Sequence, residues 1–199
     1  MLLSGAAAAL AGTALGIRSM AQQEVPRVAV LTAAFFVASL VHVPLGPASV
    51  HLVLNGLLGL VLGWACFPAI LVALLLQAIF FQYGGLSVLG VNTVIMALPA
   101  LICFLVFAPL LRRRQSLAVL AGFLAGSLSI FGAAALLALC LALSGEAFIP
   151  AAQTLLAAHI PIMFLEGLLT AVIVRFLLRI RPEILHTRLH PGSPENREL

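Results

Sequence analysis

The sequence predicts an all-α membrane protein, a polytopic bundle of about seven transmembrane helices. Of its 199 residues, 63% are apolar and only 8% are charged, whereas about a quarter of the residues in a soluble domain are charged. The mean hydropathy is +1.23, and every charged side chain is an arginine or a glutamate. The apolar runs between the charges are too long and too uniform for a soluble core. The composition therefore excludes a soluble enzyme, a nucleic-acid-binding protein and a disordered chain.

Seven apolar segments follow one another, and each is expected to form a helix: 3–17, 28–43, 49–64, 67–82, 90–111, 117–143 and 150–179. A helix needs about 17–25 residues to span a bilayer. The first four segments lie at or below this range, and the last two exceed it. Residues 1–181 are thus expected to form a single transmembrane domain, and the polar residues 182–199 a disordered cytoplasmic tail.

Turn residues or charges separate the segments, in chain order: Pro26, Pro44-Leu45-Gly46-Pro47, Phe67-Pro68, Gly84-Gly85, Arg112-Arg113-Arg114 and Ser144-Gly145-Glu146. If the connections alternate sides, every arginine lies on or next to the side that holds the first, third and fifth connections and the C-terminal end. Arginine concentrates on the cytoplasmic side of membrane proteins. The pattern therefore predicts an N-terminus outside and a C-terminus in the cytoplasm.

Two histidines flank one short outer turn. His42 ends the second segment, and His51 opens the third. Imidazole nitrogens suit nickel, cobalt, copper and zinc, so His51 and His42 are candidate metal ligands. Asn55 follows His51 by one helical turn and is expected to fix its ring. The alternative is that His42 lies at the membrane interface and that His51 caps or packs against a helix.

The other polar side chains of the apolar segments are expected to line an outward-opening cavity. Gln77 and Asn92 lie at the outer ends of the fourth and fifth segments. Glu166 lies deep in the seventh segment, seven residues after His159, and a carboxylate there needs a partner or a proton. It either forms a structural polar core, with His159 or with neighbouring amides, or lines an ion path. We expect the structural role.

Small residues form a stripe along the first segment at Ala8, Gly12 and Gly16. Such stripes let helices approach closely, within the bundle or against a partner subunit. The sequence contains no GxxxxGK[ST] phosphate loop and no hydrolase motif. The chain is therefore predicted not to be an enzyme, and to depend on partners for energy.

Residues 77–92, QAIFFQYGGLSVLGVN, resemble the "QALLF..GG...LGAN" signature of the CbiM/NikM family. Members of this family are the substrate-binding S components of energy-coupling factor (ECF) transporters for cobalt and nickel. Two further regions are similar to the family. His51 lies where the family begins a helix with "HL..G", and His159 with Glu166 matches "H.P...EG". The resemblance covers most of residues 25–180.

This resemblance implies an ECF S-component bundle with six core helices and an additional N-terminal helix. Its partners would be a CbiQ/NikQ-like T component and CbiO/NikO-like ATPases in a prokaryotic plasma membrane, with ATP hydrolysed by those ATPases. The transported substrate would be Co²⁺ or Ni²⁺, without an organic cofactor, and His51 is the one ligand that carries over. The stripe of Ala8, Gly12 and Gly16 is similar to the small-residue motif that S components turn towards the T component.

One motif departs from the family. The family begins "MHI..G", and its histidine and terminal nitrogens bind the metal, whereas this sequence begins Met1-Leu2-Leu3-Ser4-Gly5. Either the start has been assigned too far downstream, or these ligands have been lost. Two alternatives therefore stay open beside metal uptake. One is a structural or assembly subunit that has kept the fold and lost the metal site, and the other is an S component for another small substrate.

Overall fold

The computed structural model describes residues 1–40, 42–45, 48–51, 53–111 and 114–186, with backbone alone for 42–45, 48–51 and 186. It contains these elements in chain order: α1 (Leu2–Arg18), η1 (Gln22–Glu24), α2 (Val25–Ser39), β1 (His42–Leu45), β2 (Ala48–His51), α3 (Asn55–Leu62), η2 (Gly63–Ala65), α4 (Cys66–Phe81), η3 (Leu86–Val88), α5 (Leu89–Leu111), α6 (Gln115–Ser144), η4 (Glu146–Phe148), α7 (Ile149–Ile180) and α8 (Glu183–His186).

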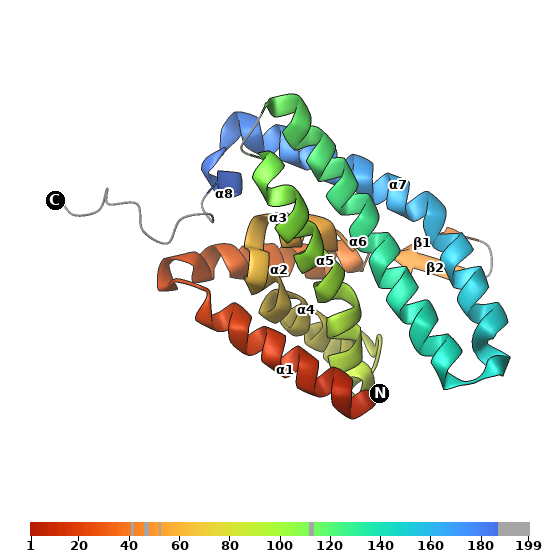
Figure 1. The fold of residues 1–199 in the computed structure, drawn as a ribbon. Helices are drawn as coiled ribbons and strands as arrows, with labels where there is room; N and C mark the ends of the chain where they lie inside the picture. The colour runs from red at the N-terminus through yellow and green to blue at the C-terminus, as the bar shows by residue number, and fades with distance from the viewer. Residues whose placement is uncertain (41, 46–47, 52, 112–113, 187–199) are drawn as a thin grey trace.

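The long helices α6 and α7 pack side by side along one flank, and α5 lies between this pair and α1, α2 and α4 (Figure 1). By length and composition alone, four stretches could cross a membrane: Asn55–Phe81, which joins α3 and α4 across the turn at Gly63, Leu86–Leu111, Gln115–Ser144 and Glu146–Ile180. Together, α1 and α2 can form a fifth, broken span with a bend of 105°. The predicted helical membrane bundle is confirmed, and its last three helices begin and end within two residues of the predicted segments. Fewer than seven full spans result, because the N-terminal half is divided into shorter helices.

The segment predicted over 49–64 contains a half-length helix at the centre of the bundle. Helix α3 has eight residues, all of them buried, and is about 12 Å long. Its glycines let it lie directly on α5. A Cβ atom on Gly59 would come within 2.2 Å of the Ala100 carbonyl oxygen, and one on Gly63 within 3.0 Å of the Phe104 ring. Gly63 follows Gly59 by four residues, and Phe104 follows Ala100 by four residues, so α3 runs parallel to α5.

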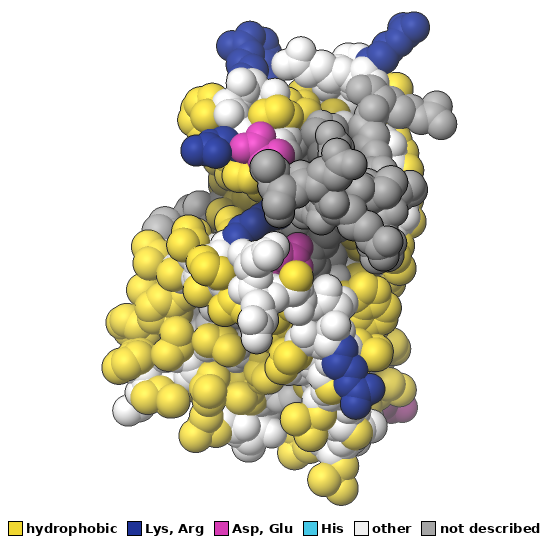
Figure 2. Space-filling view, turned by 90° about the vertical axis from the view of Figure 1, so that its left-hand side faces the viewer, with side chains coloured by type: hydrophobic (Ala, Val, Ile, Leu, Met, Phe, Trp, Pro, Cys, Tyr) yellow, Lys and Arg dark blue, Asp and Glu magenta, His cyan; other side chains and the backbone are white. Residues whose placement is uncertain are grey.

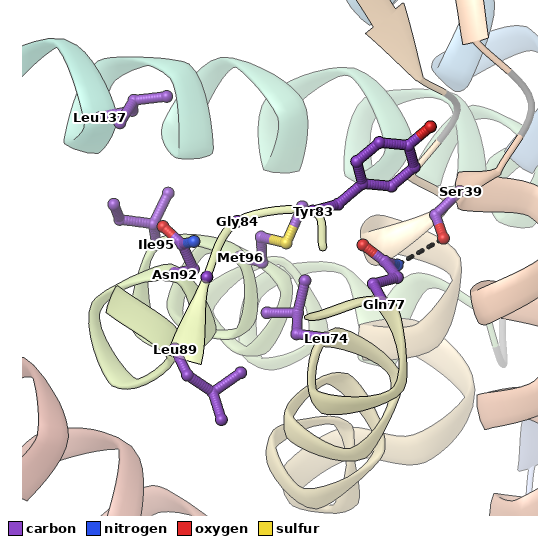
Figure 3. Close-up of a pocket in the computed structure, with 11 residues that line it drawn as sticks. Ser39, Leu74, Gln77, Tyr83, Gly84, Leu89, Asn92, Ile95, Met96 and Leu137 are labelled. Carbon is purple, nitrogen blue, oxygen red and sulfur yellow. Dashed lines mark hydrogen bonds between the residues drawn. The ribbon is translucent and has the colours of Figure 1, made fainter. Parts of the chain in front are cut away.

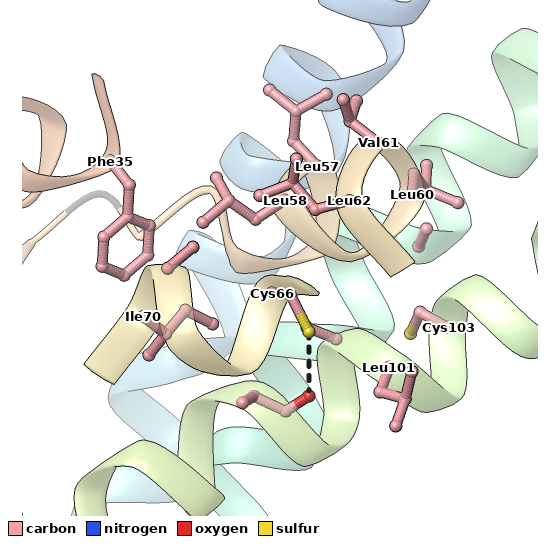
Figure 4. Packing of buried hydrophobic residues seen from close by; sticks show 14 of the residues in the cluster. Phe35, Leu57, Leu58, Leu60, Val61, Leu62, Cys66, Ile70, Leu101 and Cys103 are labelled. Atoms are coloured by element: carbon pink, nitrogen blue, oxygen red, sulfur yellow. Dashed lines mark hydrogen bonds between the residues drawn. The ribbon is translucent and has the colours of Figure 1, made fainter. Parts of the chain in front are cut away.

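After α3 the chain reverses direction. Gly63 has a φ of 55°, a conformation that glycine adopts without steric cost. The Cys66 thiol at the start of α4 then donates to the Ala97 carbonyl at 3.8 Å, nearer the start of α5 than the Gly63 contact (Figure 4). Around this reversal Phe35, Leu62 and Ile70 are fully buried. The main apolar core therefore surrounds α3 and the beginning of α4.

A β-hairpin that the sequence did not predict precedes α3. Its strands β1 and β2 are antiparallel, and the register pairs His42 with His51. Opposite residues in such a ladder have Cα atoms about 4.5–5.5 Å apart. The hairpin contacts α7 through β2 and extends away from α8 (Figure 1). The helices predicted over 28–43 and 49–64 are thus shorter than expected, because their facing ends form this hairpin.

The opposite end of the bundle carries arginines (Figure 2) and the short helix α8 (Figure 1). One Arg27 Nη donates to the Val61 carbonyl at 3.1 Å and to the Ile184 carbonyl. Leu185 is buried in the main core. Of the residues expected to form a disordered tail, 183–186 instead form α8, which packs against the bundle. Residues 187–199 lie outside the described part of the chain.

The small-residue stripe of α1 faces α4 within the same chain. An added Cβ on Gly12 would come within 2.4 Å of the Phe67 ring, and one on Gly16 within 2.5 Å of the Pro68 ring. Both glycines are buried, whereas Ala8 is exposed. The prediction that the whole stripe meets a partner subunit is corrected at Gly12 and Gly16, because α4 already occupies the space beside them.

Candidate metal site

Two adjoining cavities lie near the ends of α5, α6 and α7 that are remote from α8. Their volumes are about 230 Å³ and about 260 Å³. Ile95, Met96 and Leu137 line both cavities, so the two spaces adjoin. The wall of the first carries several polar side chains, and His159 is the polar residue of the second.

The first cavity collects amide side chains from α4 and α5. Gln77 and Asn92 line it, together with Ser39 and Tyr83 (Figure 3). Gln77 Nε2 donates to Ser39 Oγ at 2.5 Å, which joins the end of α2 to α4. The structure thus brings together the two amides that the sequence placed at one cavity. One hydrogen bond of the Gln77 amide therefore joins two residues of the cavity wall.

The second cavity is lined by His159 of α7 and by Val53, the residue that precedes α3 by two positions. His159 Nδ1 lies 2.8 Å from the Leu155 carbonyl oxygen. A carbonyl can only accept, so Nδ1 carries the proton and Nε2 of the neutral ring carries a lone pair. His159 therefore presents a potential ligand nitrogen at a cavity wall. His159 and Glu166 bond different groups, His159 the Leu155 carbonyl and Glu166 main-chain amides.

Glu166 binds the backbone at the beginning of α3. Its Oε1 accepts hydrogen bonds from the Val53 and Leu54 amides, and its Oε2 accepts from Leu54 at 3.0 Å. The first amides of a helix lack partners within the helix and carry partial positive charge. A fully buried carboxylate from α7 therefore satisfies donors that would otherwise be buried without partners. The partners of Glu166 are thus main-chain amides two and three residues after His51.

Asn55 fastens the same helix start to α5 and α6. Its Nδ2 donates to the Met96 carbonyl at 3.3 Å, and its Oδ1 accepts from the Gly56 amide and from Ser129 Oγ, both at 2.9 Å. This set uses both the donor and the acceptor side of the amide. The prediction that Asn55 fixes the ring of His51 falls on a side chain outside the described part of the structure. Asn55 holds three elements together.

The side chains of His42 and His51 lie outside the described part of the structure, and the backbone register alone places these residues opposite each other. The described residues contain no group of three or more His, Cys, Asp or Glu side chains that could hold a metal ion. Sequence reasoning did not single out Ser39, Met96 or Ser129. Met96 and Ser129 are ordinary members of apolar helices in sequence, and only the packing shows that they meet a cavity or an amide.

The family described as "CbiM: Cobalt uptake substrate-specific transmembrane region" matches residues 1–184. The chain is 43% identical over 189 residues to the "Putative metal transport protein" of Haemophilus influenzae, which covers 94% of this chain and 92% of that protein. It is 35% identical over 182 residues to the "Cobalt transport protein CbiM" of Sorangium cellulosum, covering 84% and 81% of the two chains.

The fold is similar to that of a truncated transition metal transporter whose crystal structure is known. The two structures share a TM-score of 0.72 and 25% identity, over 89% of this chain and 93% of the other. The similarity therefore extends over most of both chains.

Proposed function

Because the chain belongs to the CbiM family of cobalt uptake substrate-specific transmembrane regions, we propose that it captures Co²⁺ or Ni²⁺ for import across a prokaryotic plasma membrane. It acts as the S component of an ECF transporter. The ion enters from the outside, and the subunit itself hydrolyses no ATP. Its metal transport relatives and the similar fold of a transition metal transporter support this assignment.

The observation that carries the proposal is the register of the hairpin. It pairs His42 with His51, so the two residues best suited to a nitrogen-rich metal site are direct neighbours across the strands. Residues at opposite positions have Cβ atoms about 4.5–5.5 Å apart on one face. Two imidazoles at such positions can bind one ion, and imidazole suits cobalt and nickel. His51 is the main ligand in this proposal, and His42 the second.

Glu166 anchors the backbone next to this site. Its carboxylate holds the Val53 and Leu54 amides, two and three residues beyond His51. The strand end is thus tied to α7 at a buried point, while the hairpin itself stays beside α7. Positioned ligands bind metals more tightly because the groups around them fix their orientation. Glu166 is therefore a positioning residue in the proposed site.

The subunit works with a CbiQ/NikQ-like T component and CbiO/NikO-like ATPases in this proposal. The arginine-bearing end faces the cytoplasm, as the positive-inside rule requires, and the hairpin faces outward. Helix α1 exposes Leu3 and Leu10 beside Ala8. These apolar side chains face lipid or the T component, whereas Gly12 and Gly16 serve contact with α4.

The test is metal binding by the purified protein in detergent. We expect calorimetry to show that Co²⁺ or Ni²⁺ binds, that His51→Ala abolishes binding, and that His42→Ala weakens it. Thr154→Ala, an exposed change on α7, is the control and should bind normally. The same titrations are made on a form with an MHxxxG start. If neither form binds either ion, metal capture is refuted and a structural or assembly subunit becomes the better explanation.

A further inference from the structure

We infer that His159 is a direct ligand of the transported ion, through Nε2, in the cavity between α5, α6 and α7. This inference rests on the proposed function and extends its site beyond the hairpin. Three independent observations support it: the tautomer of the His159 ring, the composition of the cavity wall, and the position of His159 relative to His51.

The tautomer of His159 is set by its own helix. The Leu155 carbonyl lies 2.8 Å from Nδ1 and accepts the Nδ1 proton, which leaves the Nε2 lone pair free for an ion. Histidines that bind metals almost always donate their other ring N–H to a carbonyl, a carboxylate or water, because this fixes the ring and makes the ligand nitrogen more basic. The arrangement of His159 is the one expected of a ligand, and metal binding through Nε2 displaces no proton from the ring.

The cavity wall is suited to a borderline or soft metal ion. Besides His159, its described lining includes the side chain of Met96 and otherwise aliphatic residues of α5, α6 and α7. No carboxylate is among these lining residues. Imidazole and thioether favour late transition metals, whereas Mg²⁺ and Ca²⁺ need oxygen ligands. A volume of about 260 Å³ accommodates an ion with water in its remaining coordination positions.

His159 lies at the level of the hairpin. Glu166 contacts Val53, which lies two residues after the end of β2. His159 precedes Glu166 by seven residues, or about 10 Å of helix, and two residues of chain from His51 to Val53 reach at most about 7 Å. Strand β2 contacts α7, and both run from this point away from α8 (Figure 1). Val53 and His159 line the same cavity, so His159 borders the space next to the end of the hairpin.

The first experiment combines calorimetry with X-ray absorption of the bound Co²⁺, which counts imidazole ligands. His159→Gln keeps a polar side chain of similar reach but has no imidazole. We expect its affinity for Co²⁺ to fall at least about tenfold, because losing a residue that only supports a metal ligand already lowers affinity by about that factor. We also expect one imidazole ligand to disappear from the spectrum. Thr154→Ala is the matched control, because Thr154 also bonds the carbonyl four residues before it, at 2.9 Å, but is exposed.

The second experiment uses the unaltered protein and so does not depend on the folding of a variant. Diethyl pyrocarbonate modifies unprotonated histidine nitrogens, and mass spectrometry of the peptide that contains His159 reports the extent. We expect Co²⁺ to protect His159 from modification, and Mg²⁺ not to protect it.

The outcomes separate the inference from the proposed function. If the wild type binds Co²⁺ while His159→Gln retains the affinity and the imidazole count, and Co²⁺ gives no protection, His159 is not a ligand, although metal capture stands. If the wild type binds neither Co²⁺ nor Ni²⁺, the proposed function itself fails.

Discussion

Replacing Glu166 tests whether a carboxylate from α7 holds the beginning of α3. In Glu166→Leu the Val53 and Leu54 amides lose a charged acceptor. A hydrogen bond to a charged group contributes about 1.5–3 kcal/mol, so two such donors predict a loss of about 3–6 kcal/mol in the free energy of unfolding. Glu166→Gln keeps a neutral acceptor, which contributes about 0.5–1.5 kcal/mol per bond, and should lose about 2–3 kcal/mol. The predicted order of stability is therefore wild type, then Gln, then Leu.

The assay is reversible unfolding of the purified protein by SDS in mixed micelles, followed by circular dichroism. Glu146→Gln is the matched control, because Glu146 is exposed and the same chemical change there should alter stability by less than about 0.5 kcal/mol. Co²⁺ affinity measured on the same samples should follow the same order, since His51 is two residues from the anchored amides. The reasoning is refuted if Glu166→Gln is as stable as the wild type, or if the Gln and Leu variants are equally unstable.

Three further predictions concern the packing and the orientation. Gly59→Ala should prevent stable folding, measured by gel filtration and thermal unfolding, because its Cβ would lie 2.2 Å from the Ala100 carbonyl oxygen; a folded variant with normal stability would contradict the close contact of α3 and α5. Asn55→Asp should lower stability by about 1–3 kcal/mol, since it loses the donor to the Met96 carbonyl and leaves that carbonyl facing another acceptor; equal stability in SDS titrations would contradict this bond. A membrane-impermeant maleimide should label half-buried Cys140 from outside intact cells, and labelling only in inverted vesicles would reverse the proposed orientation.

The sequence predicted the long helices because their apolar runs are uninterrupted. Segments 90–111, 117–143 and 150–179 agree with α5, α6 and α7 within two residues. Lipid-facing helices need only length and hydrophobicity, and both are visible in a sequence. The prediction failed between residues 42 and 62, where strands and a half-length helix share the same apolar composition. Periodicity cannot distinguish short apolar strands from short buried helices.

The sequence pointed to several residues around the candidate site but not to the atoms with which they form hydrogen bonds. The sequence singled out Glu166, Asn55 and His159 as polar groups in apolar segments. Each of them turned out to bond main-chain atoms: the amides that begin α3, the Met96 carbonyl, and the Leu155 carbonyl. Backbone groups are present at every position and so leave no trace in a sequence pattern. For this reason the sequence suggested partners among side chains, whereas the fold supplies them from the chain itself.

The half-length helix α3 also constrains the order in which the protein is assembled in the membrane. At about 12 Å it is too short to cross a hydrocarbon core of about 30 Å by itself. The amides of Val53 and Leu54, just before this helix, bond to Glu166, which is 112 residues further along the chain from Leu54. In lipid, amides without partners are costly, so α3 cannot settle at its final depth until α7 has been synthesised and inserted. We therefore expect a nascent chain that ends before α7 to hold its hairpin and α3 at the membrane surface, and completion of the last long helix to be the step that draws them inward.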